Sequence, residues 1–274
     1  PQIGRFRVNL YKQRRSYCAA IRVLVQQMPT IESLGLPPAL RELSLRRQGL
    51  ILVTGPTGCG KSTTLAAMVN CINRNRCCHV LTIEDPIEYL HRHGKSIINQ
   101  REIGDDTRSF ADGLRAAMRE DPDVVLVGEM RDLDTIATAI SAAETGHLVL
   151  SALRIIGAAQ TVSRLVDMFP PFQQQQIRVQ LSAVLQAVIT QRLLPNALCD
   201  GRVPAVELLL GTDAVRRMIR ENHCGQIAAE MQTGIGQGML PMDYSLAKLV
   251  QENRITRRQA LAHCTDRETL ERYL

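Results

Sequence analysis

The sequence predicts an α/β fold, in which a mostly parallel sheet is flanked by helices, and three observations support this prediction. A glycine-rich segment, residues 55–62, lies between an apolar run and a helical pattern. From residue 49 onward, short apolar runs alternate with helical patterns, which is typical of parallel strands joined by helical crossovers. Two of the runs end in carboxylates. The carboxyl ends of parallel strands meet at one edge of a sheet, and ligands bind there.

The glycine-rich segment fits the phosphate-loop pattern G-x-x-x-x-G-K-[ST] at every fixed position. Its glycines let backbone N–H groups wrap around phosphate, and the N-terminus of the next helix adds partial positive charge. We expect Lys61 to reach the β- and γ-phosphates and Ser62 to bind Mg²⁺. A glycine-rich turn that merely starts a helix is the alternative, and the flanking strand and helix patterns disfavour it. The expected nucleotide contacts are Gly55, Pro56, Thr57, Gly58, Cys59, Gly60, Lys61, Ser62 and Thr63.

Composition narrows the class of protein. Of 274 residues, 45% are hydrophobic, 3% are aromatic and none is Trp, so the core must be aliphatic. Few aromatic rings are available to stack on bases, and the net charge of +6 is largely spread along the chain, so nucleic acid is a disfavoured partner. The 8 cysteines form no C-x-x-C pair, which favours reduced thiols in the cytosol over disulfides or zinc. With no apolar run long enough to span a membrane, we expect a cytoplasmic protein.

The chain before the phosphate loop is expected to hold two strands and a linker. Residues 5–10 and 19–24 have strand character and are joined by a basic loop. Arg5 and Arg7 would share one face of the first strand, and by local pattern alone that face would be solvated. Residues 29–48, which contain several prolines, predict a linker with a short helix near 38–45. The first residue is not Met, so we expect the chain to begin inside a domain that ends near residue 28.

The rest of the chain alternates between strand and helix patterns before it becomes helical. We expect strands over 50–54, 79–86, 96–100, 123–129 and 147–152, and helices over 63–69, 108–120, 132–145 and 157–168. Residues 173–194 show one long helical pattern, and a strand over 203–210 follows it. The expected units are an ATPase-type domain over 49–212 and a helical region over 213–274.

Carboxylates and arginines follow two of the predicted strands. Glu129 ends an apolar strand, where a carboxylate can hold Mg²⁺ through water or polarise the attacking water, or can merely cap the next helix. Glu84, Asp85 and Glu88 form a second acidic cluster, which would repel itself without a cation. An exposed acidic turn around Pro86 is the alternative. We also expect Arg115, Arg119 and Arg131 near these carboxylates, unless they are simply solvated or salt-bridged.

Several segments together resemble the type IV pilus retraction ATPases (PilT-like) of the secretion ATPase superfamily. They are the phosphate loop, T-I-E-D-P-I-E at 82–88, N-Q-R-E at 99–102, L-R-x-x-M-R-E-D-P-D at 114–123, V-G-E-M-R-D at 127–132 and A-A-E-T-G-H at 142–147. The resemblance covers nearly all of residues 5–260. It implies a RecA-like P-loop NTPase motor domain, preceded by the end of a truncated PAS-like domain over 1–28. It also implies a homohexameric ring that hydrolyses ATP with Mg²⁺ to power pilus retraction.

The resemblance also implies roles for individual residues and partners. Glu88 and Glu129 match the glutamates of the two acidic boxes. Arg7 and Arg22 match paired arginines that contact nucleotide phosphates across the ring. The segment A-V-R-R-M-I-R-E at 214–221 is similar to a C-terminal signature of retraction motors. The implied partners are an inner-membrane pilus platform protein, through which the ring would reach the membrane, and an accessory paralogous ATPase.

One departure from the family pattern concerns the chemistry. The family's histidine box reads T-L-H-T, whereas this chain reads Ala152-Leu153-Arg154-Ile155. We expect Arg154 to contact the nucleotide or to pair with Glu88 or Glu129, unless it turns outward to solvent. Two other functions stay open. One is a motor for pilus assembly, secretion or DNA uptake, and the other is a weakly hydrolysing accessory ring subunit.

Overall fold

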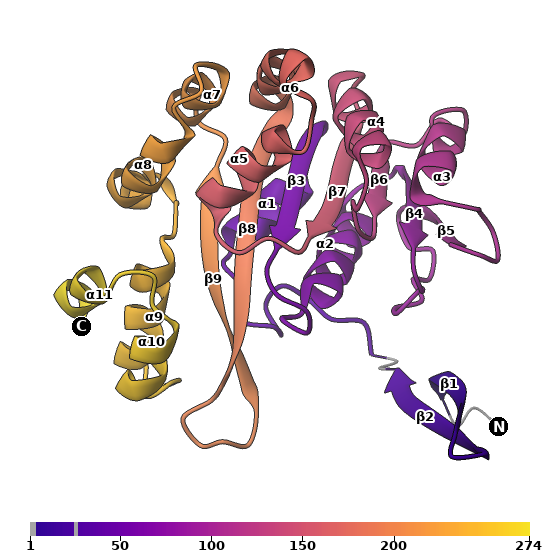
Figure 1. Cartoon of the computed structure of the whole chain (residues 1–274), viewed down its shortest axis with the longest axis horizontal. Helices are drawn as coiled ribbons and strands as arrows, with labels where there is room; N and C mark the ends of the chain where they lie inside the picture. The colour runs from indigo at the N-terminus through magenta and orange to yellow at the C-terminus, as the bar shows by residue number, and fades with distance from the viewer. Residues whose placement is uncertain (1–3, 25–26) are drawn as a thin grey trace.

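A seven-stranded sheet forms the centre of the protein in the computed structural model, which describes residues 4–24 and 27–274. The strand order is β5-β4-β6-β7-β3-β8-β9 (Figure 1). All neighbouring strands are parallel except β8 and β9. The predicted mostly parallel sheet is confirmed, and the strand expected over 96–100 is present at one edge of the sheet as β5. The strands are β3 Gly49–Thr54, β4 His79–Glu84, β5 Ile97–Glu102, β6 Val124–Val127, β7 Leu148–Leu153, β8 Leu185–Pro195 and β9 Arg202–Leu210.

Helices cover both faces of the sheet because alternate side chains of each strand point to opposite faces. In β3, Leu50 and Leu52 join a hydrophobic cluster with α3 to α7, whereas Ile51 and Val53 join one with α1 and α2. A third cluster packs α9 to α11 against β8 and β9. The helices are α1 Ala39–Ser44, α2 Lys61–Asn75, α3 Phe110–Ala117, α4 Leu133–Glu144, α5 Ala158–Asp167, α6 Pro171–Val184, α7 Asp213–Arg220, α8 Ile227–Thr233, α9 Met242–Gln251, α10 Arg257–His263 and α11 Arg267–Tyr273. None of these helices, within the described residues, is long and apolar enough to span a bilayer.

The prediction of one long helix over 173–194 is wrong in its second half. α6 ends at Val184, and β8 begins at the next residue, Leu185. The error arises because Leu185 and Val188 continue the apolar spacing of the helix, although here they belong to a strand that is buried along most of its length. No glycine or proline marks the boundary. The β-branched run from Val188 to Thr190 is the one local signal for a strand.

Residues 29–48 pack onto the sheet domain. Ile31, Leu36, Leu40 and Leu43 are buried in the same cluster as α2. The predicted short helix is present as α1. This stretch therefore gives the body of the protein part of its core.

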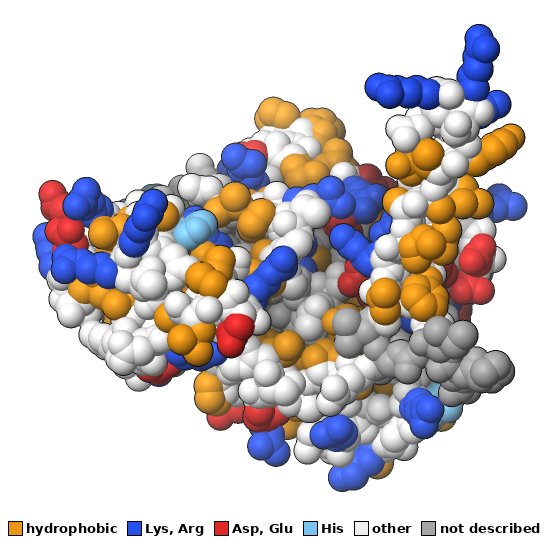
Figure 2. All heavy atoms as spheres, turned by 90° about the horizontal axis from the view of Figure 1, so that it is seen from below, with side chains coloured by type: hydrophobic (Ala, Val, Ile, Leu, Met, Phe, Trp, Pro, Cys, Tyr) orange, Lys and Arg blue, Asp and Glu red, His pale blue; other side chains and the backbone are white. Residues whose placement is uncertain are grey.

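The two N-terminal strands, β1 Arg5–Gln13 and β2 Ser16–Leu24, form an antiparallel hairpin. Both predicted strands are present and extend further than expected. Their two-residue turn is Arg14-Arg15, with φ of 44° and 68°. Figure 2 shows the hairpin projecting from the body, with basic side chains at its free end and hydrophobic side chains along it. The PAS-like assignment of this segment remains a prediction.

Candidate nucleotide site

A cleft of about 810 Å³ lies where β3, β4, β6 and β7 end. The phosphate loop, both acidic segments and the N-terminal hairpin all contribute to its walls. Gly55, Pro56 and Cys59, which were also expected to contact nucleotide, do not line it. Pro56 and Cys59 line a second cavity of about 360 Å³ instead. The predicted site residues that line the main cleft are Arg7, Arg22, Thr57, Gly58, Gly60, Lys61, Ser62, Thr63, Glu88, Glu129 and Arg154.

The phosphate loop has the conformation that an anion cradle requires. Gly55, Gly58 and Gly60 have φ of 136°, 80° and 91°, a region that residues with a Cβ rarely adopt. A Cβ at Gly58 would meet no atom within 4 Å, so the loop is open at that point. Gly60 precedes α2 and provides no side-chain cap, which leaves the first N–H groups of this helix available to an anion.

The lysine of the motif lies against the loop itself. Lys61 Nζ donates hydrogen bonds to the carbonyl oxygens of Gly55 and Pro56, each at 2.9 Å. The exposed Ser62 lies beside it in the first turn of α2. A cation, a hydroxyl and helix N–H groups therefore face one cleft, and this donor set fits a phosphate chain with its divalent cation.

Glu129 lies between two arginines. Its carboxylate accepts hydrogen bonds from Arg154 at 2.5 and 3.0 Å and from Arg131 at 2.7 Å. The Glu129 side chain is only 13% exposed. Burial opposes its ionisation, but the hydrogen bonds and charges of the two arginines outweigh burial and lower the pKa of Glu129. The carboxylate is therefore ionised at neutral pH.

The second acidic segment divides into groups with different surroundings. Glu84 accepts hydrogen bonds from Thr82 at 2.7 Å and Gln100 at 3.0 Å, and burial raises its pKa. Asp85 lies 3.4 Å from the guanidinium of Arg131, so this arginine joins the two acidic segments. Glu88 lines the same cleft. The exposed-turn alternative therefore fails for Glu84, which is held in place by neutral donors.

The hairpin is attached to this acidic segment within the same chain. Arg5 donates to the carbonyl oxygens of Ile87 at 2.8 Å and Glu88 at 3.3 Å. Arg7 and Arg22 face each other across the hairpin strands and line the cleft of their own chain. Both side chains are exposed, so the solvated face suggested by local pattern is compatible with their position at the cleft. The cross-ring contact that the resemblance implied for these two arginines remains a prediction.

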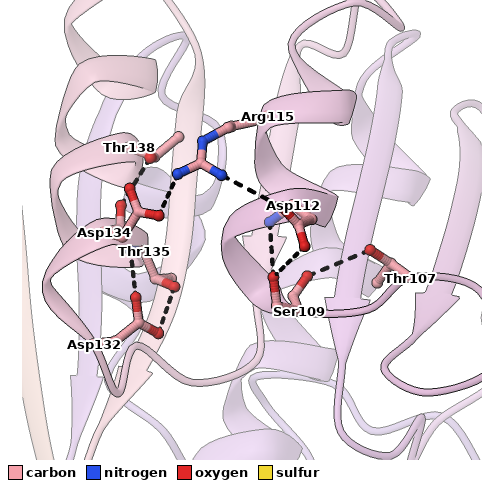
Figure 3. Close-up of polar contacts among 8 residues, drawn as sticks. All are labelled: Thr107, Ser109, Asp112, Arg115, Asp132, Asp134, Thr135 and Thr138. Atoms are coloured by element: carbon pink, nitrogen blue, oxygen red, sulfur yellow. Dashed lines mark hydrogen bonds and ion pairs between the residues drawn. The ribbon is translucent and has the colours of Figure 1, made fainter.

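The expectation that Arg115 lies near the carboxylates of the cleft is wrong. Arg115 forms ion pairs with Asp112 on its own helix, at 3.4 Å, and with Asp134 on α4, so it ties α3 to α4 (Figure 3). The same view shows Asp132 capping α4, where its carboxylate accepts from the backbone N–H of Thr135 at 2.8 Å. Because Asp132 performs the capping role, the cap interpretation of Glu129 is also wrong.

Three residues near the loop were missed by the sequence analysis. Tyr89 and His91 line the cleft, and the Tyr89 hydroxyl lies 3.0 Å from that of Thr63. Gln191 contacts the loop from β8. No clear local signal marks Gln191, because Gln186, Thr190 and Arg192 are further polar residues of the same stretch and the whole stretch was assigned to a helix.

All 8 cysteines are free thiols, as the sequence indicated. The ring of His93 accepts a hydrogen bond from the backbone N–H of Ile98 at 3.0 Å. Within residues 4–24 and 27–274, no three His, Cys, Asp or Glu side chains gather into a metal site.

The chain is similar to known proteins in sequence and in fold. A family model described as Type II/IV secretion system protein matches residues 2–272. The twitching motility protein of Neisseria gonorrhoeae is 47% identical over 270 residues, which cover 98% of this chain and 72% of that protein. The type IV pilus retraction ATPase PilT of Pseudomonas aeruginosa is 47% identical over 260 residues, which cover 95% of this chain and 75% of that protein. A crystal structure of the pilus retraction motor PilT with bound ADP is similar with a TM-score of 0.92 at 52% identity, covering 98% of this chain and 77% of that one.

Proposed function

Because the chain belongs to the Type II/IV secretion system protein family, we propose that it is an ATP-hydrolysing motor that powers retraction of type IV pili. The observation that carries this proposal is the cleft, which brings the phosphate loop, Glu129 and the hairpin arginines together in one chain. Similarity to a twitching motility protein and to a retraction ATPase supports retraction as the direction of work.

In this proposal the loop binds the phosphates of ATP, and Lys61 offsets their charge. The Ser62 hydroxyl ligates Mg²⁺, which prefers oxygen ligands and keeps several waters. The described residues offer no metal site of three acidic, His or Cys side chains, so the cation would depend on phosphate oxygens. Mg²⁺ and ATP are therefore proposed to bind together.

Glu129 orients the attacking water and balances the charge of Mg²⁺. Its lowered pKa keeps the carboxylate charged, but it also makes Glu129 a weak base. We therefore assign it orientation and charge balance in preference to early proton abstraction. Arg7 and Arg22 stabilise negative charge that develops on the transferred phosphoryl group.

The family also supports a proposal for assembly. We propose a homohexameric ring in the cytoplasm that is held at the inner membrane by a pilus platform protein and works beside an accessory paralogous ATPase. A nucleotide at each cleft would bind between the hairpin and the sheet domain, so the two parts could close around it. We also propose the domain boundaries that the sequence predicts, at residues 28, 48 and 212.

One observation favours a second candidate function. Arg154 occupies both oxygens of Glu129, which is the carboxylate that hydrolysis needs. A ring subunit with this ion pair would turn over ATP slowly and would work as an accessory to an active motor.

The test combines turnover with pilus behaviour. Purified rings of wild type, Lys61→Ala and the control Lys95→Ala are compared for ATP hydrolysis, since Lys95 is exposed and does not line the cleft. We expect Lys61→Ala alone to abolish turnover while the fold is kept.

Cells that lack the protein should keep their pili and lose retraction, and only wild type and Lys95→Ala should restore it. Loss of pili would indicate an assembly motor, and wild-type rings without turnover would favour the accessory subunit.

A further inference from the structure

Gln191 reaches the phosphate loop from a strand that is distant in sequence. It follows Thr190, which pairs in parallel register with Thr54, the last residue of β3 before the loop. The hydroxyl groups of Thr54 and Thr190 lie 2.6 Å apart. Gln191 is 2% exposed, so its amide must find partners inside the protein.

Both ends of the Gln191 amide are used, and both partners belong to the loop and the helix that follows it. Nε2 donates to the carbonyl oxygen of Cys59 at 2.5 Å, and Oε1 accepts from the Thr64 hydroxyl at 2.8 Å. A carbonyl oxygen can only accept, so the amide nitrogen must face Cys59 and the amide oxygen must face Thr64. One side chain therefore links the loop to the first turn of α2.

Two glycines of the motif pass close to the same residue. A Cβ at Gly55 would lie 2.4 Å from the backbone oxygen of Gln191, and one at Gly60 would lie 3.0 Å from its Nε2. The loop and β8 can approach this closely only because neither position has a side chain. Gln191 therefore lies against the loop at Gly55, where the loop begins, and near its end at Cys59 and Gly60. It also contacts Thr64 in the first turn of α2.

We propose that Gln191 is a positioning residue for the nucleotide site, which sets the curvature of the phosphate loop and thereby its affinity for nucleotide phosphates. The inference rests on the proposed function, because it takes the loop to be the phosphate site. Loss of the amide leaves the Cys59 carbonyl and the Thr64 hydroxyl buried without this partner. The loop would relax to recover hydrogen bonds, and its N–H groups would no longer converge on one anion.

The chain contains a matched control for this proposal. Asn70 is also a buried amide, and it lies on α2 itself, but its Nδ2 donates to the carbonyl oxygen of Pro29 at 2.8 Å. Asn70→Leu and Gln191→Leu therefore remove the same chemical group with similar retention of volume. They differ in whether the lost partner belongs to the phosphate loop.

The experiment measures ADP affinity and thermal stability on purified full-chain rings. We expect both leucine variants to lower Tm. We expect Gln191→Leu to weaken ADP binding by about tenfold, the equivalent of one net buried hydrogen bond, and Asn70→Leu to change it by less than about twofold. A Gln191→Leu protein with a lower Tm and unchanged ADP affinity would reduce Gln191 to a stabilising residue and overturn the proposal.

Two further variants keep the test decisive if Gln191→Leu fails to fold. Gln191→Glu keeps the acceptor for Thr64 but cannot donate to Cys59, and Thr64→Val removes the other bond. Both should weaken ADP binding, and Gln191→Glu more strongly because it adds negative charge beside the loop. Lys61→Ala tests separately whether the loop binds the nucleotide at all. If Lys61→Ala weakens ADP binding and no Gln191 or Thr64 variant does, only the positioning role is wrong. If Lys61→Ala also leaves binding unchanged, the loop is not the nucleotide site.

Discussion

Arg154 binds Glu129 through two contacts, Nε to Oε1 at 2.5 Å and Nη2 to Oε2 at 3.0 Å. Arg131 contacts the same carboxylate at 2.7 Å. The expected pairing of Arg154 with Glu129 is present, and its expected contact with the nucleotide remains a prediction. Arginine is a permanently charged residue type, whereas histidine, which the family pattern has there, is not. Glu129 is therefore held by two fixed cations at the position where hydrolysis needs a free carboxylate.

Replacing Arg154 with histidine should raise the rate of ATP hydrolysis per ring. A paired carboxylate must give up its bonds to Arg154 before it can orient water. The Arg154 side chain is 58% exposed, so the pair is worth about 1 kcal/mol or less, and we expect a rise of roughly two- to fivefold. Turnover of wild type, Arg154→His and Arg154→Ala at equal ring concentration is the measurement.

The alanine variant separates loss of the ion pair from gain of an imidazole. Arg47→His is the control, because Arg47 is exposed and does not line the cleft. Equal rates in wild type and both Arg154 variants, with equal nucleotide affinity, would show that the ion pair does not limit turnover. Ile155 is buried in the first hydrophobic cluster, so replacing it with threonine would cost stability without placing a donor in the cleft.

Glu129→Gln should keep ATP binding and lose hydrolysis. The amide has the shape of the carboxylate but no negative charge, so it cannot balance Mg²⁺ or orient water in the same way. Single-turnover hydrolysis and ADP affinity are measured on the same rings, with Glu42→Gln on α1 as control. If affinity collapses while the rate per bound ATP is kept, Glu129 serves in binding and the assignment of its role is wrong.

Much of the sheet and the loop could be predicted because their signals are local. The phosphate loop is a contiguous motif, and Glu129 directly follows a short apolar strand, so each is readable within a few residues. The alternation of strands and helices then places both at one edge of a parallel sheet. Arg154 follows β7, which is another parallel strand of this sheet, so its position at the same edge could be predicted in the same way.

The remainder depends on contacts between distant segments. Arg115 was expected in the cleft, but its partner Asp134 lies on another helix, and the packing of α3 against α4 decides the pair. Gln191 was hidden because buried strands and buried helices share apolar spacing over short runs. The position of the exposed hairpin arginines Arg7 and Arg22 at the cleft depends on contacts between the hairpin and the distant acidic segment, such as those of Arg5 with Ile87 and Glu88.

Arg7→Ala and Arg22→Ala should each slow ATP turnover by about tenfold or more, since arginines at phosphoryl-transfer sites have large effects on rate. Both line the cleft of the chain that also supplies Lys61. A mixed ring of Arg7→Ala and Lys61→Ala subunits should therefore stay inactive, because no single cleft regains both residues. Arg14→Ala in the hairpin turn is the control for folding of this segment. Recovery of activity in mixed rings would show instead that the arginine acts on a neighbouring subunit.

His91 should make the free energy of unfolding depend on pH between about 6.5 and 4. Burial lowers the pKa of His91 from 6.5 to about 4. Within this window the unfolded chain binds a proton that the folded chain does not bind, so folding stability is present above pH 6.5 and decreases as the pH falls. The limiting slope is about 1.4 kcal/mol per pH unit, and carboxylates add their own dependence at the acid end.

The His91 contribution is obtained by difference. Denaturant unfolding of wild type and His91→Gln is measured from pH 7.5 to 4.5, and the two curves of unfolding free energy against pH are subtracted. The difference should be constant above about pH 7 and should change steadily below about pH 6.5, with wild type losing stability faster. The carboxylates titrate in both proteins and cancel. Parallel curves over the whole range would mean that His91 takes up its proton as readily in the folded protein as in the unfolded chain, and the burial argument would then be wrong.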